Sequence, residues 1–114
     1  MIGQQRQYYI LNIGSGNDYL MNPKDQIIKA IDIYLQGMYT TQDFCNVFVE
    51  LYYFETSGNQ YFKGKEKCEL DHLAQLAERF TTSVEDVLKF PNYYTSEKQI
   101  WEAANSTKGA LKDN

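Results

Sequence analysis

The chain has 114 residues, which is the length of one domain with a single hydrophobic core. Hydrophobic residues make up 43% of it and aromatic residues 15%, so the composition excludes a disordered tail. Fifteen acidic residues against eleven basic ones give a net charge of −4. This balance disfavours nucleic acid and anionic membranes and favours a basic partner, although it also suits a cytosolic protein that only needs to stay soluble.

Residues 1–20 differ in pattern from the rest of the chain. The stretch from Tyr8 to Ile13 favours a strand, and Gly14 to Asp18 is typical of a turn or linker. Met21 stands directly before a strong helix start. We therefore predict a short non-helical extension or linker over residues 1–20. It could be an appendage, the result of an upstream translation start, or a packed extension.

The first predicted helix covers residues 23–36. Asn22 can accept hydrogen bonds from free backbone amides, and Pro23 supplies a helical φ at the first position. Gly37 suits the position after a helix that needs a positive φ. Apolar residues recur at three- and four-residue spacing, as expected of an amphipathic helix: Ile27, Ile28, Ile31, Tyr34 and Leu35.

The second predicted helix runs from residue 41 to about Phe54. It follows a start that resembles a capping box, Thr40 to Asp43, and it stops before Ser57. Only about five residues separate it from the first helix, which favours an antiparallel pair. Its apolar stripe is the clearest in the chain: Phe44, Val47, Phe48, Leu51 and Tyr52.

In the second half of the chain, the pattern predicts a loop over 59–67, a helix over 66–80 and a short turn over 85–88 that is capped by residues 81–83 and ends before Pro91. Ser96 and Gln99 form a further capping box, which opens a fourth helix.

The predicted helices are too short to be stable alone, so their apolar faces must pack together. The sequence therefore predicts an all-α fold, a small antiparallel four-helix bundle over residues 21–105. Residues 106–114 are expected to be a frayed tail.

The sequence carries no recognisable catalytic or metal site. The single histidine, His72, follows Asp71 on the predicted outer face of its helix, which is weak support for a small enzyme. Cys45 and Cys68 lack CxxC spacing, and no HxxxH motif or calcium loop is present. We predict two reduced thiols, no metal, no cofactor and no enzymatic activity.

The sequence shows neither a secretory signal pattern nor an apolar run long enough to cross a bilayer. We therefore expect a cytoplasmic protein without membrane contact. The aromatic clusters lack a basic groove around them, so direct nucleic-acid binding is not expected either.

Acidic residues are concentrated around the end of the second predicted helix and along the third. Residues 21–105 hold thirteen acidic and eight basic residues. If the helical faces coincide, the acids form a patch that fits a basic cleft on another protein. An exposed Tyr53 would suit such an interface. The predicted partner-binding residues are Glu50, Tyr53, Glu55, Glu66, Glu69, Asp71, Gln75 and Glu78.

The helix-hairpin features over residues 23–104 resemble the immunity proteins of the colicin D type. That family shows a helix ending in glycine, a short capped turn, an acidic-aromatic pair and an aromatic-rich second helix. The residues that carry the resemblance are the stretch Ile33 to Phe44 with Phe48, Glu50 and Leu51, then Leu73, Ala77, Phe80, Pro91, Tyr94, Ser96 and Glu97.

The resemblance implies a bacterial cytoplasmic four-helix bundle that binds a cytotoxic nuclease, commonly one that cleaves transfer RNA, and blocks its active site. Its relatives protect cells that deploy colicins or contact-dependent growth-inhibition toxins. We therefore expect an immunity protein that forms a 1:1 complex with its cognate nuclease domain, with acidic side chains in place of RNA phosphates. The alternative is a non-enzymatic adaptor or regulatory bundle with a different protein partner.

Overall fold

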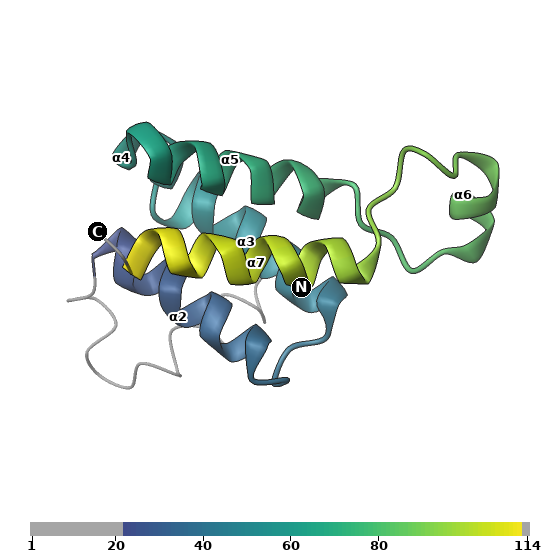
Figure 1. Cartoon of the computed structure of the whole chain (residues 1–114), viewed down its shortest axis with the longest axis horizontal. Coiled ribbons are helices and arrows are strands. Elements are labelled where there is room, and N and C mark those ends of the chain that lie inside the picture. Colours follow the sequence, from purple (N-terminus) through teal and green to yellow (C-terminus); the bar gives the residue numbers. More distant parts are fainter. Residues whose placement is uncertain (1–21, 113–114) are drawn as a thin grey trace.

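The computed structural model describes residues 22–112, which are mostly helical and form no strand (Figure 1). This confirms the all-α prediction for the described part of the chain, whereas the extension predicted over residues 1–20 lies outside it. The elements in chain order are α2 (Pro23–Leu35), α3 (Thr41–Glu50), the π-helix η2 (Leu51–Glu55), α4 (Gly58–Tyr61), α5 (Gly64–Glu78), α6 (Val84–Lys89) and α7 (Glu97–Lys112).

Three of the predicted helix starts are capped by the expected side chains. Asn22 Oδ1 accepts from the backbone N–H of Asp25 at 2.8 Å, and Thr40 Oγ1 accepts from that of Asp43 at 3.1 Å. Ser96 Oγ accepts from the N–H of Gln99 at 3.1 Å, and Gln99 Oε1 accepts in return from Ser96 at 2.8 Å. Each cap satisfies amides that the helix leaves unpaired.

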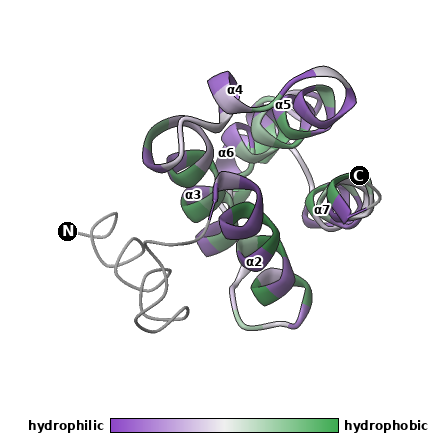
Figure 2. Cartoon of the chain, turned by 90° about the vertical axis from the view of Figure 1, so that its left-hand side faces the viewer, coloured by the Kyte–Doolittle hydropathy of each residue, from purple (hydrophilic) through white to green (hydrophobic). Residues whose placement is uncertain are grey.

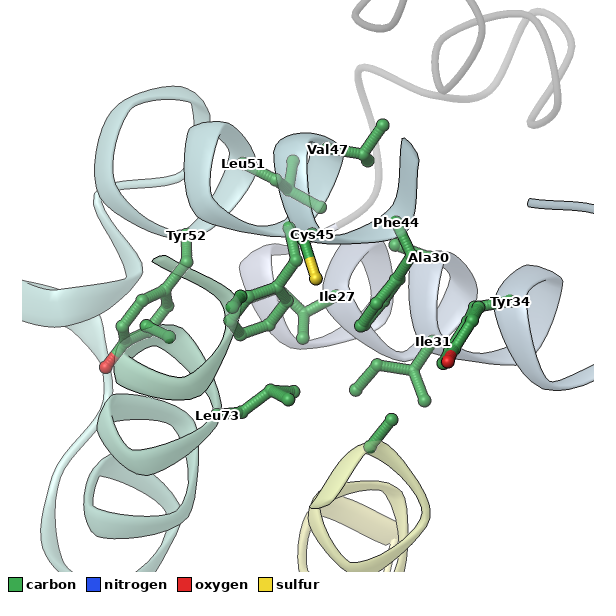
Figure 3. Packing of buried hydrophobic residues seen from close by; sticks show 14 of the residues in the cluster. Ile27, Ala30, Ile31, Tyr34, Phe44, Cys45, Val47, Leu51, Tyr52 and Leu73 are labelled. Atoms are coloured by element: carbon green, nitrogen blue, oxygen red, sulfur yellow. The ribbon is translucent and has the colours of Figure 1, made fainter. Parts of the chain in front are cut away.

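The core is built on an aromatic ladder along α3 and η2. Phe44, Phe48 and Tyr52 stand four residues apart, so one helix face carries all three, and all are fully buried. Their ring centroids lie 5.7 and 5.6 Å apart. The ring of Tyr34 from α2 stacks on Phe44 at 4.3 Å (Figure 3). The ladder therefore joins α2 to α3 and reaches Leu73 of α5, which is also fully buried.

The four long helices α2, α3, α5 and α7 surround this core. The end-on view in Figure 2 shows them as separate coils around a common centre. α2 packs against α3 and α7, and α5 packs against α3 and α7. None of the helices between residues 22 and 112 combines the length and the apolar character needed to cross a membrane.

Two stretches predicted as irregular contribute to the core. The segment predicted as a loop contains the short helix α4, and Phe62 directly after it is buried against Tyr52, with ring centroids 6.4 Å apart. α7 continues to Lys112, where a frayed tail was expected. Its last turns are held because Leu111 is fully buried and Lys108 pairs with Asp32 of α2 at 2.6 Å.

One helix stands apart from the others. α6 has no buried residue and makes no extensive contact with another helix, and Figure 1 shows it projecting beyond the ends of α5 and α7. The segment 81–94, here called the arm, leaves and rejoins the bundle at one point. There Phe80 and Thr95 form an isolated bridge, in which Thr95 N–H donates to the carbonyl of Arg79 at 2.9 Å.

Candidate protein-binding groove

A shallow groove of about 350 Å³ lies between α3 and α5. α3 and η2 supply one wall, and the C-terminal end of α5 with Phe80 supplies the other. Its lining residues are Gln42, Cys45, Asn46, Val49, Glu50, Phe54, Ala77, Glu78 and Phe80. We call it the α3–α5 groove.

The α3 wall carries polar residues four positions apart, so one helix face presents them in a row. Gln42 Nε2 donates to Asn46 Oδ1 at 3.3 Å, and Glu50 continues the row. Phe54 follows Glu50 at the same spacing and is 74% exposed. An exposed phenylalanine beside a groove is an apolar anchor of the kind that protein interfaces bury.

Two carboxylates, Glu50 and Glu78, face the groove from opposite walls. Neither forms an ion pair with another residue of the described part of the chain, whereas several other acids there do. A carboxylate without a cationic neighbour keeps its full negative potential for an incoming lysine or arginine. The structure thus brings these two predicted residues together on one groove.

Tyr53 is half-buried, not exposed as the sequence analysis expected. It packs against Tyr52, with ring centroids 5.2 Å apart. The cause is the wider π-helical turn of η2, which turns two adjacent tyrosines toward the protein. Burial raises the pKa of the Tyr53 hydroxyl, and the negative charges of Glu78 and Asp71 raise it further. Tyr53 therefore lies close to the acids on this side of α5.

Asp71 makes structural contacts on the α3 side of α5. Its carboxylate accepts from the buried Tyr52 hydroxyl at 2.6 Å and pairs with Lys67 at 2.7 Å. Burial by itself would raise the pKa of the Asp71 carboxyl, but the hydrogen bonds from Lys67 and Tyr52 outweigh it, so that pKa is lowered. Burial and the hydrogen bond to Asp71 hold the pKa of Tyr52 far above its ordinary value.

The remaining predicted residues do not join the groove. Glu66 pairs with Lys24 of α2 at 3.0 Å. Glu69 accepts from Ser106 of α7 at 3.3 Å, on the other side of α5. Gln75 and Glu55 are exposed and lie outside the groove lining. The predicted acids thus do not form one patch, because Glu50 and Glu55 lie outside α5 and the four acids of α5 point to different sides of that helix.

A second groove, of about 460 Å³, lies between α5 and α7. His72 lines it with Glu69 and Glu102, whereas the carboxylate of Asp71 accepts hydrogen bonds on the α3 side. His72 and Asp71 are adjacent in the sequence, but their side chains therefore lie on different sides of α5. Within residues 22–112 no three His, Cys, Asp or Glu side chains are grouped to hold a metal ion.

Both cysteines are free thiols. Cys45 lies at the floor of the α3–α5 groove but is 1% exposed, and burial raises the pKa of its thiol to about 12. It is therefore protonated and unreactive at neutral pH, which is typical of a structural cysteine. Cys68 is exposed on α5.

Sequence reasoning missed the uncharged part of the α3–α5 groove. The residues concerned lie on the other side of the predicted helix whose apolar stripe was recognised: Gln42, Asn46, Val49 and Phe54. The four-residue spacing of Gln42, Asn46 and Glu50 is the signal that could have identified this wall. Phe80 could not be found in this way, because it lies beyond the end of its helix.

Comparisons with known proteins found no match: no family model, no curated protein and no solved structure is similar to this chain at the significance required.

Proposed function

We propose that this protein is an immunity protein that binds a cognate nuclease toxin and neutralises it by covering the basic active-site cleft. The observation that carries the proposal is the α3–α5 groove, in which Glu50 and Glu78 lie on opposite walls among polar and apolar side chains. The helix-hairpin resemblance to colicin D-type immunity proteins supplies the class of partner.

The groove suits a basic protein surface for two physical reasons. The two carboxylates attract lysine and arginine side chains of the kind that line a nuclease cleft, which speeds association and orients the partner. Phe54 offers apolar area beside them, and burial of such an anchor slows dissociation. A protein acting in this way occupies the cleft and performs no chemistry of its own.

The scaffold fits the same proposal. We interpret α2, α3, α5 and α7 as an antiparallel four-helix bundle, in which the groove is formed by the side chains of two neighbouring helices. Because each chain has a single α3–α5 groove, we expect one nuclease domain per chain. The protein would act in the bacterial cytoplasm, where its toxin's RNA substrate is found.

Charge reversal in the groove tests the proposal. The probe is a nuclease domain encoded by a gene that neighbours this one, if such a gene exists; its absence would contradict the proposal. Association of that domain with the protein is followed by surface plasmon resonance at two salt concentrations. Because charge mainly controls the association rate, the double variant Glu50→Lys/Glu78→Lys is expected to associate roughly 10–100-fold more slowly at low salt.

The matched control is Glu69→Lys/Glu102→Lys, which reverses two charges in the α5–α7 groove and therefore changes the net charge by the same amount. It is expected to bind at close to the wild-type rate. Equal effects of the control and the double variant would assign the attraction to net charge and contradict a role for the groove. Tight binding by wild-type protein without loss of RNA cleavage would favour the adaptor alternative.

A further inference from the structure

The arm, residues 81–94, presents apolar side chains that nothing in the described chain covers. Val84, Val87 and Leu88 stand at positions i, i+3 and i+4 of α6, so they share one helix face. Val84 is 72% exposed and Leu88 is 76% exposed. Phe90 and Tyr93 follow directly and are more than half exposed. Isolated apolar residues on a surface are ordinary, but a contiguous group of this size indicates an interface.

The arm is held in shape by its own hydrogen bonds. Ser83 Oγ caps α6 by accepting from the N–H of Asp86 at 3.2 Å, and the Phe90 N–H donates to the carbonyl of Asp86 at 3.0 Å. The guanidinium of Arg79 lies 5.1 Å from the ring centroid of Tyr93. A surface that is already ordered loses little conformational entropy when it binds.

The charges on the arm favour one occupant. α6 carries Glu85 and Asp86 in its first turn and Lys89 in its last. When two copies of α6 lie antiparallel, the acidic end of each meets the basic end of the other. A patch that fits itself in this way meets the requirement of a twofold interface. The α3–α5 groove, which carries acids on both walls, does not meet it.

We propose that the arm is a homodimerisation surface, in which α6 packs antiparallel against α6 of a second copy of this chain through Val84 and Leu88. The five apolar residues expose roughly 500 Å² per copy, so the pair buries about 1,000 Å², close to the lower limit for a specific interface. The dimer is therefore weak, with a dissociation constant of roughly 10–100 μM.

The arm and the α3–α5 groove are separate surfaces, so the dimer does not depend on the partner that the groove binds. The arm extends beyond the helix ends (Figure 1). The groove is lined by side chains of α3, η2 and the end of α5. A dimer joined through the arms leaves both grooves open. With one partner per chain, the complex then contains two copies of each protein.

Sedimentation velocity of the full chain alone tests the proposal, over a dilution series that spans the expected dissociation constant. The wild type is expected to shift from the mass of one chain to twice that mass. Leu88→Ser should weaken the dimer at least tenfold and leave the thermal midpoint unchanged, because α6 takes no part in the core. Met38→Ser, at a 63% exposed position between α2 and α3, is the matched control and should dimerise normally.

A charge exchange tests the antiparallel arrangement. Glu85→Lys and Lys89→Glu should each remain monomeric alone, because like charges then meet across the interface. Mixing the two variants should restore a dimer, because opposite charges meet again. A salt bridge within one helix would not respond to mixing. The proposal is overturned if the wild type stays monomeric throughout the series, if Leu88→Ser and Met38→Ser dimerise equally, or if mixing restores nothing.

Discussion

Tyr52, Lys67 and Asp71 form a contact that holds η2 against α5, the two elements on either side of the α3–α5 groove. Tyr52 ends the aromatic ladder, and its hydroxyl donates to a carboxylate of α5 at 2.6 Å. Lys67 approaches the same carboxylate at 2.7 Å from one turn earlier in the helix. The hydroxyl thus ties η2 to α5 and sets the spacing between the two walls. Asp71 therefore supports the site structurally, whereas Glu50 and Glu78 face the groove itself.

The lowered pKa of Asp71 predicts how stability depends on pH. The ordinary value is 3.8, and the folded value lies below it. The contribution of the charged carboxylate is therefore complete above pH 3.8 and is lost as the pH falls through the folded pKa. Asp71→Asn is expected to reduce the unfolding free energy at neutral pH by about 0.5–1 kcal/mol, after allowance for solvent screening.

Urea unfolding of both proteins at several pH values measures this difference, which should vanish in strong acid. Glu102→Gln, which neutralises an exposed acid away from this contact, should keep the wild-type pH dependence. A stability difference for Asp71→Asn that stays constant from neutral pH to strong acid would assign the loss to packing instead of charge.

At the scale of elements, α2, α3 and α7 were identified by an apolar period together with a cap, whereas α5 was identified by its apolar period alone, since it has no side-chain cap. The helix from Pro23 to Leu35 has Asn22 before it and Gly37, with φ of +88°, after it. Both end signals are local, so they can be read from a few residues. Glu50 and Glu78 were also predicted as partner-binding residues, because a concentration of acidic residues can be recognised from the sequence alone.

The features that the sequence did not identify depend on contacts between distant residues. α4 has four residues and no side-chain cap, and it is held because Phe62 packs on Tyr52. The last turns of α7 depend on Leu111 reaching a core made by other helices. Glu78 of α5 lines the α3–α5 groove, whereas Glu69 lines the α5–α7 groove. Which groove each acid faces depends on how α5 is rotated about its axis relative to α3 and α7. Such rotations follow from packing, which no local spacing reveals.

The close approach of α4 to the aromatic ladder gives a prediction for glycine. A Cβ on Gly58 would lie 2.6 Å from Cδ1 of Tyr52, closer than any ordinary contact. Since the Tyr52 ring is fully buried, it has no room to move aside. Gly58→Ala is therefore expected to lower the unfolding free energy by about 1–3 kcal/mol, as measured by urea denaturation.

Gly109 of α7 is the matched control for this substitution. A Cβ there meets nothing within 4 Å, and alanine favours the helix more than glycine does. Gly109→Ala should raise the unfolding free energy by up to about 1 kcal/mol. Equal effects of the two substitutions would show that the contact with Tyr52 is not what excludes a side chain at residue 58.

At the scale of the whole molecule, the two candidate surfaces lie apart and have opposite character. The α3–α5 groove combines acids with a single apolar anchor, Phe54, and suits a basic partner. The arm is apolar with charges of both signs and suits a second copy of itself. This separation means that the proposed neutralisation and the proposed self-association would use different residues.

The measurement that tests the central proposal most directly is cleavage of transfer RNA by a nuclease domain encoded in a neighbouring gene, and the absence of any such gene would contradict the proposal. With one equivalent of the protein present, cleavage should stop. With one equivalent of Glu50→Lys/Glu78→Lys it should continue at close to the uninhibited rate, while Glu69→Lys/Glu102→Lys, which changes the net charge equally, inhibits like the wild type. Full cleavage in the presence of excess wild-type protein, or equal inhibition by the wild type and the groove variant, would contradict neutralisation through the α3–α5 groove.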